Sequence, residues 1–156
     1  MNIRRLNPKI DQALYAQAFE WEKNYPRWLR DAEKACSVPL PEFLERAVTR
    51  ADIGIFAPDF CGMVSIIPRG EGVFEGHIWA RRGSAVSVLA EAVDRIRQSL
   101  VRDVGMRAGF VWIVKNNRPI KKVCILAGLT PDGAEVVDGE SHGKPIVWQR
   151  LSCMTV

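Results

Sequence analysis

The stretch FVWIVKNNRPIKKVCILAG, residues 110–128, decides the fold class because it passes from a strand through a polar bend into a helix. Residues 110–114 form an apolar run of the length expected for a buried strand, and a Lys-Asn-Asn segment ends it. Asn117, followed by Arg-Pro, is typical of a helix N-cap with proline in the first turn. The helix is expected over residues 118–127, with Gly128 as its cap. This stretch therefore predicts a mixed α and β fold.

The flanking segments supply the other elements. Residues 84–102 carry apolar side chains at helical spacing and predict the clearest helix in the chain. The side chains expected to face inward from it are Ala85, Val88, Leu89, Ala92, Ile96 and Leu100. Before this helix, short apolar runs predict three antiparallel strands at residues 52–57, 61–67 and 73–79, with turns at 58–59 and 68–70. After residue 128, a turn at 130–133 is expected to lead into strands at 135–137 and 144–151.

The N-terminal third is expected to be mainly helical. A short strand at residues 3–6 precedes Asn7 and Pro8, which predict an N-cap and the first helical residue. The apolar side of that helix would carry Ile10, Leu14, Ala18 and Trp21. Further helical segments are expected between Pro26 and Arg50.

Length and composition favour one domain over residues 1–156. The chain has 156 residues, of which 47% are hydrophobic, so it can bury one core and is short for two. No apolar run approaches the length of about 20 residues that a membrane helix needs. Arg4 and Arg5 at the start are not followed by the apolar region of a signal peptide. We therefore expect a cytoplasmic protein without a membrane partner.

Cysteine spacing and charge limit the partners. The four cysteines are far apart and form no CxxC pair, so buried reduced thiols are expected and no metal site. The formal charge of +4 is modest, and acidic and basic residues are mixed along the chain. Six basic residues are concentrated in two segments: Arg81, Arg82, Lys115, Arg118, Lys121 and Lys122. A phosphorylated cofactor accounts for them as well as DNA does, and nucleic acid is the less favoured partner.

The order of elements resembles the GNAT superfamily of N-acetyltransferases over nearly the whole chain. The specific part is residues 113–119, followed by Ala-Gly-Leu at 127–129 and Asp-Gly at 132–133. The resemblance implies a single α+β domain with a mixed, mostly antiparallel central sheet flanked by helices. It also implies acetyl-coenzyme A (acetyl-CoA) as cofactor, with Asn117 in contact with its pantetheine arm. A helix N-cap alone is the other interpretation of Asn117, and both roles are compatible.

Residues 80–85 resemble the pyrophosphate-binding loop of the same superfamily. Gly83 and Ala85 match the pattern, whereas Ala80 stands where the family has glutamine or arginine. Backbone N–H groups at a helix start and the helix dipole favour a phosphate there. The implied cofactor-binding residues are Ile78, Trp79, Ala80, Arg81, Arg82, Gly83, Ser84, Ala85 and Asn117. An ordinary strand-to-helix turn with a basic edge is the alternative interpretation of this loop.

The resemblance also implies direct attack of an amine on a thioester held between the strands at 73–79 and 110–114. By strand alternation, Glu75 and His77 share one face, and both are candidate catalytic bases. A free histidine has a pKa near 6.5, whereas a glutamate would need burial to raise its pKa. Cys124 stands where the family often has a tyrosine that protonates the leaving thiolate, so no general acid is assigned.

Three functions remain open from the sequence. The leading one is an acetyl-CoA-dependent N-acetyltransferase that acts on a primary amine of a small molecule or a protein. The second is a GNAT-fold binding or assembly protein without turnover, of bacteriophage type, which Ala80 and Cys124 would permit. The third is a nucleic-acid-binding domain. A homodimer is compatible with exposed strand edges.

Overall fold

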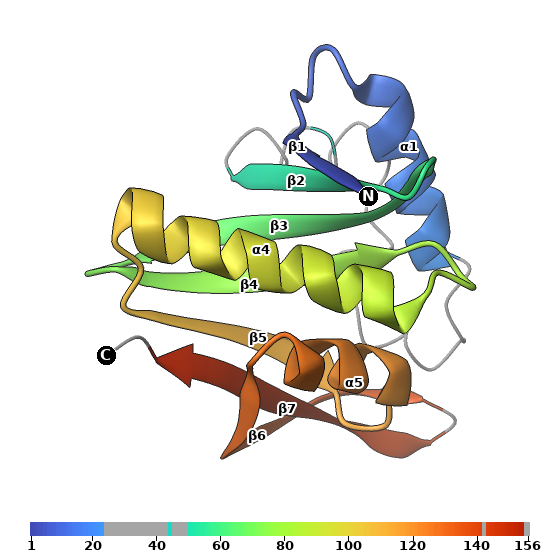
Figure 1. Cartoon of the computed structure of the whole chain (residues 1–156). Helices are drawn as coiled ribbons and strands as arrows, with labels where there is room; N and C mark the ends of the chain where they lie inside the picture. Colours follow the sequence, from blue (N-terminus) through green and yellow to red (C-terminus); the bar gives the residue numbers. More distant parts are fainter. Residues whose placement is uncertain (24–43, 45–49, 142, 155–156) are drawn as a thin grey trace.

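The computed structural model describes residues 1–23, 44, 50–141 and 143–154. Within these ranges, seven strands form one sheet in the order β1-β2-β3-β4-β5-β7-β6 (Figure 1). The strands are β1 (Asn2–Arg5), β2 (Ala51–Phe56), β3 (Phe60–Gly70), β4 (Val73–Ala80), β5 (Ala108–Val114), β6 (Thr130–Ser141) and β7 (Lys144–Met154). Only the β4–β5 pair is parallel among the described pairs. The predicted α+β fold with a mixed, mostly antiparallel sheet is confirmed.

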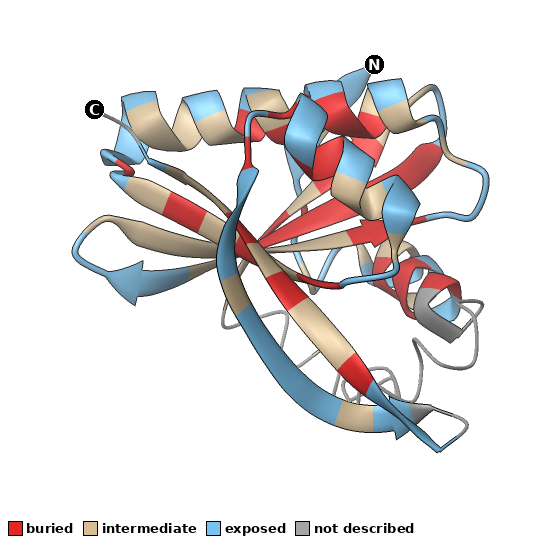
Figure 2. Cartoon of the chain, turned by 90° about the horizontal axis from the view of Figure 1, so that it is seen from below, coloured by how far each residue is buried: buried red, intermediate tan, exposed pale blue. Residues whose placement is uncertain are grey.

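The described helices α1 (Gln12–Lys23), α4 (Val86–Val104) and α5 (Arg118–Leu126) lie on both faces of the sheet. Val64 of β3 packs in a core cluster with α4 and α5, whereas its neighbour Met63 packs with α1. Successive side chains of a strand point to opposite faces, so α1 lies on the face away from α4 and α5. Buried residues gather where the helices meet the sheet, and β6 is mostly exposed (Figure 2).

The predicted helix at residues 84–102 is confirmed with shifted ends. The structure places α4 at Val86–Val104, followed by Gly105, whose φ of 67° is the left-handed conformation typical of a helix C-cap. Ala85, which the spacing predicted on the buried face, is instead the exposed N-cap residue. Ser84 lies before the helix, where its hydroxyl donates a hydrogen bond to the Arg81 carbonyl in the preceding loop.

The start of α1 was predicted wrongly at Pro8. The side chain of Asn7 accepts a hydrogen bond from the Lys9 N–H at 2.9 Å, which closes a local turn instead of capping a helix. Ile10 lies in this turn and is 80% exposed, so it is not part of the core. The helix begins after Asp11, whose carbonyl accepts the Tyr15 N–H. The helical segments predicted between Pro26 and Arg50 lie outside the described residues, except Leu44 and Arg50.

Two predicted turns belong to strands. Residues 68–70 continue β3, and the turn to β4 falls at Glu71 and Gly72, with φ of 54° and 77°. Residues 130–133 begin β6, which the sequence placed only at 135–137. A register shift between Pro131 and Glu135 accommodates this irregular start. Proline is tolerated there because β6 is the last strand of the sheet order.

Candidate functional site

A cleft opens within the sheet where β4 and β5 separate. The two strands pair only between residues 73–76 and residues 108–111. Beyond this point β4 continues along β3, and β5 continues along β7. The facing edges of the two strands therefore have no partner strand in the described structure. The cleft is lined by residues 76–78 of β4, residues 111–114 of β5, Asn117 and Ile120.

Asn117 lies at the end of this cleft, at the start of α5. Its side-chain oxygen accepts a hydrogen bond from the Ile120 N–H at 3.4 Å, and the predicted N-cap is confirmed. Asn117 is half-buried and lines the cleft. The cap uses the amide oxygen, so the side-chain NH₂ group is available as a donor beside the cleft.

The loop between β4 and α4 follows the same end of β4. The Arg81 N–H donates to the Cys61 carbonyl at 2.9 Å, which extends the pairing of β4 with β3 by one residue. The Ser84 hydroxyl lies 2.7 Å from the Arg81 carbonyl oxygen and 3.1 Å from that of Cys61. Gly83 has a φ of 85°, and a Cβ added there would meet no described atom within 4 Å. Gly83 thus combines a left-handed backbone with open space.

The N-terminus of α4 faces this loop without a side-chain cap from the described residues. Ala85 occupies the N-cap position and has no side-chain hydrogen-bonding group. The first backbone N–H groups of a helix lack partners within the helix, and the helix dipole adds partial positive charge. Arg81 and Arg82 are exposed in the loop and add two full charges. Together these groups make a positive end at α4 that suits an anion.

The two candidate bases lie in different surroundings. His77 is half-buried, lines the cleft directly after the paired part of β4, and lies 5.8 Å from the Trp79 ring between centroids. Glu75 lies opposite Phe110, where β4 and β5 are still paired. Arg69 forms an ion pair with Glu75 and donates from Nε to Oε2 at 2.7 Å. The carboxylate of Glu75 is therefore already engaged, and Glu75 does not line the cleft, whereas His77 does.

A buried polar cluster lies on the same sheet face as His77. The Asp52 carboxylate accepts hydrogen bonds from the Tyr15 hydroxyl at 2.8 Å and the Ser65 hydroxyl at 2.6 Å. The Arg50 Nε donates to the same carboxylate at 3.1 Å, and the Trp79 indole N–H donates to Ser65 at 3.0 Å. Burial raises the pKa of Asp52, and burial with the nearby Asp52 charge raises the pKa of Tyr15. The sequence offered one signal for this cluster, a lone aspartate within the apolar strand β2.

The β5 side of this face is aromatic. The Arg150 guanidinium of β7 lies 5.8 Å from the Phe110 ring centroid and 5.7 Å from that of Trp112. Asp132 holds the same guanidinium, with its Oδ2 2.6 Å from Nε. The sequence did not reveal these residues, because they come together only through the pairing of β5 with β7, whose paired residues are about forty positions apart.

Of the six basic residues singled out in the sequence, at least one is already engaged in an ion pair. Lys115 forms an ion pair with Glu135 at 2.7 Å. Arg118 and Lys122 are exposed on α5, and Lys121 is half-buried.

None of the described helices is long and apolar enough to cross a membrane. The described residues contain no group of three or more His, Cys, Asp or Glu that could hold a metal ion.

Solved structures match this architecture, although no protein-family model and no curated protein matches the sequence. An acetyltransferase of the GNAT family from Streptococcus pneumoniae superposes with a TM-score of 0.68, at 14% identity over 99% of each chain. The fold is that of the GNAT acetyltransferases. The microcin C7 self-immunity acetyltransferase, solved in complex with acetyl-CoA and AMP, has a TM-score of 0.72 and 16% identity, covering 98% of this chain and 92% of that one. The ribosomal-protein-S5-alanine acetyltransferase from Vibrio fischeri has a TM-score of 0.71 and 12% identity, covering 97% and 91%.

The GNAT resemblance placed Cys124 where the family often has a tyrosine. Cys124 is fully buried in the core cluster between the sheet, α4 and α5. Burial raises the pKa of its thiol to about 12. A thiol that is enclosed and retains its proton so strongly is a core residue, and it does not face the cleft lined by Asn117 and Ile120.

Proposed function

We propose that this protein binds acetyl-CoA between β4 and β5 and transfers its acetyl group to a primary amine of a small molecule or a protein. The observation that carries the proposal is the separation of β4 from β5 directly after residues 76 and 111. The positive end of α4 and the side chain of Asn117 follow the same ends of these strands. The GNAT fold of the matched acetyltransferases supports the reaction class.

The groups along the cleft fit the parts of acetyl-CoA. Pantetheine is an extended chain with two amides, and the open edge of β4 at Ile78, Trp79 and Ala80 offers backbone donors and acceptors to such a chain. Asn117 offers a side-chain donor on the other side of the cleft. When bound, acetyl-CoA supplies an acetyl group activated as a thioester.

The loop after β4 fits the pyrophosphate. Gly83 leaves room for close approach, and the backbone N–H groups that follow Ala85 point out of the start of α4. Arg81 and Arg82 supply exposed cations to the same anion, although Ala80 replaces the glutamine or arginine that the family has there. Ser84 stabilises the loop from inside through the Arg81 and Cys61 carbonyls.

His77 is the residue that we assign to proton removal from the attacking ammonium. It lines the cleft at the point where the strands separate, on the sheet face opposite α4 and α5. A backbone N–H of the open β4 edge would stabilise the negative charge that develops on the thioester oxygen. Glu75 is the weaker candidate base because Arg69 engages its carboxylate and the strands are still paired beside it. Its proposed role is to fix the position of β4.

Calorimetric titration with acetyl-CoA tests the binding step. We expect saturable binding by the wild-type protein and its loss in Gly83→Glu, which places bulk and negative charge in the loop. Gly133→Glu is the matched control, because Gly133 has nearly the same φ, 87°, and equally open surroundings in β6. Loss of binding in both variants, or no binding by folded wild-type protein, would contradict the proposal. The binding or assembly function without turnover would then be the better account of the fold.

The reaction is tested by release of free coenzyme A during incubation with a panel of primary amines. We expect at least one amine to accelerate release in the wild-type protein and not in the His77→Gln variant. Saturable cofactor binding without release in the presence of any amine would favour a binding protein that has lost turnover.

A further inference from the structure

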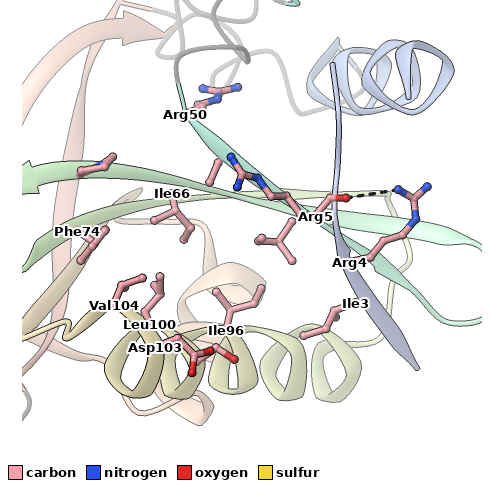
Figure 3. Close-up of a pocket in the computed structure, with 14 residues that line it drawn as sticks. Ile3, Arg4, Arg5, Arg50, Ile66, Phe74, Ile96, Leu100, Asp103 and Val104 are labelled. Atoms are coloured by element: carbon pink, nitrogen blue, oxygen red, sulfur yellow. Dashed lines mark hydrogen bonds between the residues drawn. The ribbon is translucent and has the colours of Figure 1, made fainter. Parts of the chain in front are cut away.

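A second cavity of about 790 Å³ lies between the first strands of the sheet and the C-terminal half of α4 (Figure 3). We call it the β1–α4 groove. Its apolar lining comes from strands and helix together: Ile3, Ile53, Ile66, Phe74, Ile96 and Leu100. The β1–α4 groove contains neither Asn117 nor any residue of the loop at 81–85. It is therefore separate from the proposed acetyl-CoA site at the other end of α4.

The charged residues around the groove are arranged asymmetrically. Figure 3 shows Arg5 and Arg50 on the strand side and Asp103 on the helix side. Asp103 accepts hydrogen bonds from Arg102, at 2.8 Å from Nε, and this arginine neutralises its charge. The helix side therefore contributes little net charge.

On the strand side, two of the three arginines have carboxylate partners. Arg4 is held by Asp11 at 2.9 Å, and Arg50 by Asp52 at 3.1 Å. Arg5 is exposed, and no side chain within the described part of the chain forms an ion pair with it. Its guanidinium is thus the uncompensated charge of the described groove lining.

We propose that the β1–α4 groove binds a small amphipathic carboxylate, with its apolar body on the isoleucine-rich floor and its carboxylate on Arg5. The volume is in the range of small-molecule sites, which typically combine an apolar lining with few polar groups. A guanidinium can bind a carboxylate through two parallel N–H donors. A polyanion fits less well, because the other arginines of the lining are already paired with carboxylates.

Calorimetry with octanoate tests the proposal, with octanol and octylamine as probes of the same chain length. We expect saturable binding of octanoate, weaker binding of octanol and none of octylamine. Arg5→Gln is expected to weaken octanoate binding about tenfold and to leave octanol binding unchanged, because only the charge-assisted contact is removed.

A bulky substitution tests whether octanoate binds in the groove. Ser99 lines the groove on α4, so Ser99→Trp should abolish octanoate binding. Gln98→Trp is the matched control, because Gln98 is exposed on the same helix and bonds to Asp94 away from the groove. Circular dichroism and thermal unfolding of each variant confirm that it is folded.

The results that would contradict the groove proposal differ from those that would contradict acetyl-CoA binding. The proposal is wrong if wild-type protein binds no octanoate, if octanol binds as tightly as octanoate, or if Ser99→Trp binds octanoate like Gln98→Trp. Gly83→Glu should bind octanoate like the wild type, since Gly83 does not line the groove. Octanoate binding that persists when acetyl-CoA does not bind leaves this inference standing and removes only the proposed function.

Discussion

Tyr15 and Asp52 are 37 positions apart in sequence, and a 2.8 Å hydrogen bond from the Tyr15 hydroxyl to the Asp52 carboxylate joins α1 to β2. Both side chains are almost completely buried, at 0% and 1% exposed. A carboxyl group is costly to bury without partners, so each hydrogen bond to Asp52 matters more than it would at the surface. The bond therefore fixes how α1 lies on the sheet face that carries His77.

Tyr15→Phe should lower the free energy of unfolding by about 1–3 kcal/mol, since it removes a donor and leaves a buried acceptor short of one partner. Urea denaturation measures the change. Phe19→Leu is a control for packing in the same helix, because Phe19 is also buried in the same core cluster. A Tyr15→Phe variant as stable as the wild type would show that the hydrogen bond contributes nothing net.

Asp52 should make stability depend on pH in an unusual direction. Burial raises the folded-state pKa of Asp52 above its ordinary value of 3.8, so the folded protein retains this proton to higher pH than the unfolded chain. The contribution of Asp52 to the free energy of unfolding is therefore greatest below pH 3.8 and falls as pH rises through its folded-state pKa. Asp52→Asn should abolish this fall. Denaturation of both proteins at a series of pH values tests it, and parallel curves would contradict it.

His77→Ala should reduce kcat about 10²- to 10⁴-fold if His77 is the general base, with little change in the affinity for acetyl-CoA. Added imidazole should restore part of the activity, which a purely structural role of His77 would not allow. Glu75→Gln is the comparison variant, and we expect it to lower thermal stability through loss of the Arg69 ion pair more than it lowers kcat. A larger kcat loss in Glu75→Gln than in His77→Ala would exchange the two roles.

Asn117 has two separable roles. Asn117→Ala removes the cap and should cost about 1 kcal/mol of stability, whereas Asn117→Ser retains a capping oxygen and should cost less. If the amide also binds pantetheine, both variants should bind acetyl-CoA more weakly by calorimetry. Weaker binding in the alanine variant alone would assign Asn117 to the cap and not to the cofactor.

Cys124→Tyr should destabilise the protein by about 1–3 kcal/mol instead of supplying a general acid, because Cys124 is fully enclosed. Thermal unfolding and the rate of coenzyme A release measure the two effects. Cys124→Ser keeps the volume and is the matched variant for the change in polarity. Increased kcat in Cys124→Tyr at unchanged stability would mean that this position reaches the cleft after all.

The sequence predicted those elements whose signal is local. Residues 84–102 and 118–127 have helical spacing, with Gly105 ending the first and Asn117 starting the second, and the structure keeps both helices within a few positions. The predicted start of α1 was wrong because the Asn7 side chain forms a hydrogen bond within a local turn. An Asn-Pro pair is common both in turns and at helix starts, so the sequence does not distinguish the two. The predicted length of β6 was too short because an irregular edge strand lacks the alternating apolar pattern by which strands are recognised.

The candidate site divides in the same way. Asn117 could be found because the Arg-Pro pair that follows it marks a helix N-cap, whereas Gly83 was found through the resemblance of residues 80–85 to the pyrophosphate loop. The separation of β4 from β5 could only be expected by resemblance, since it depends on the register between strands that α4 connects. The engagement of Glu75 by Arg69 required the β3–β4 register, and no spacing along the chain reveals it.

The four-residue parallel pairing also divides the described sheet into two antiparallel units that few backbone pairs join. Strands β1–β4 and strands β5–β7 are each joined by antiparallel ladders, whereas residues 73–76 and 108–111 alone pair across the boundary in the described sheet. Amide hydrogen exchange should therefore detect opening along this boundary before either ladder unfolds. A molecule that bridges β4 and β5 adds its binding free energy to that boundary. Ligand binding would then slow exchange in both units together and make the sheet open as one.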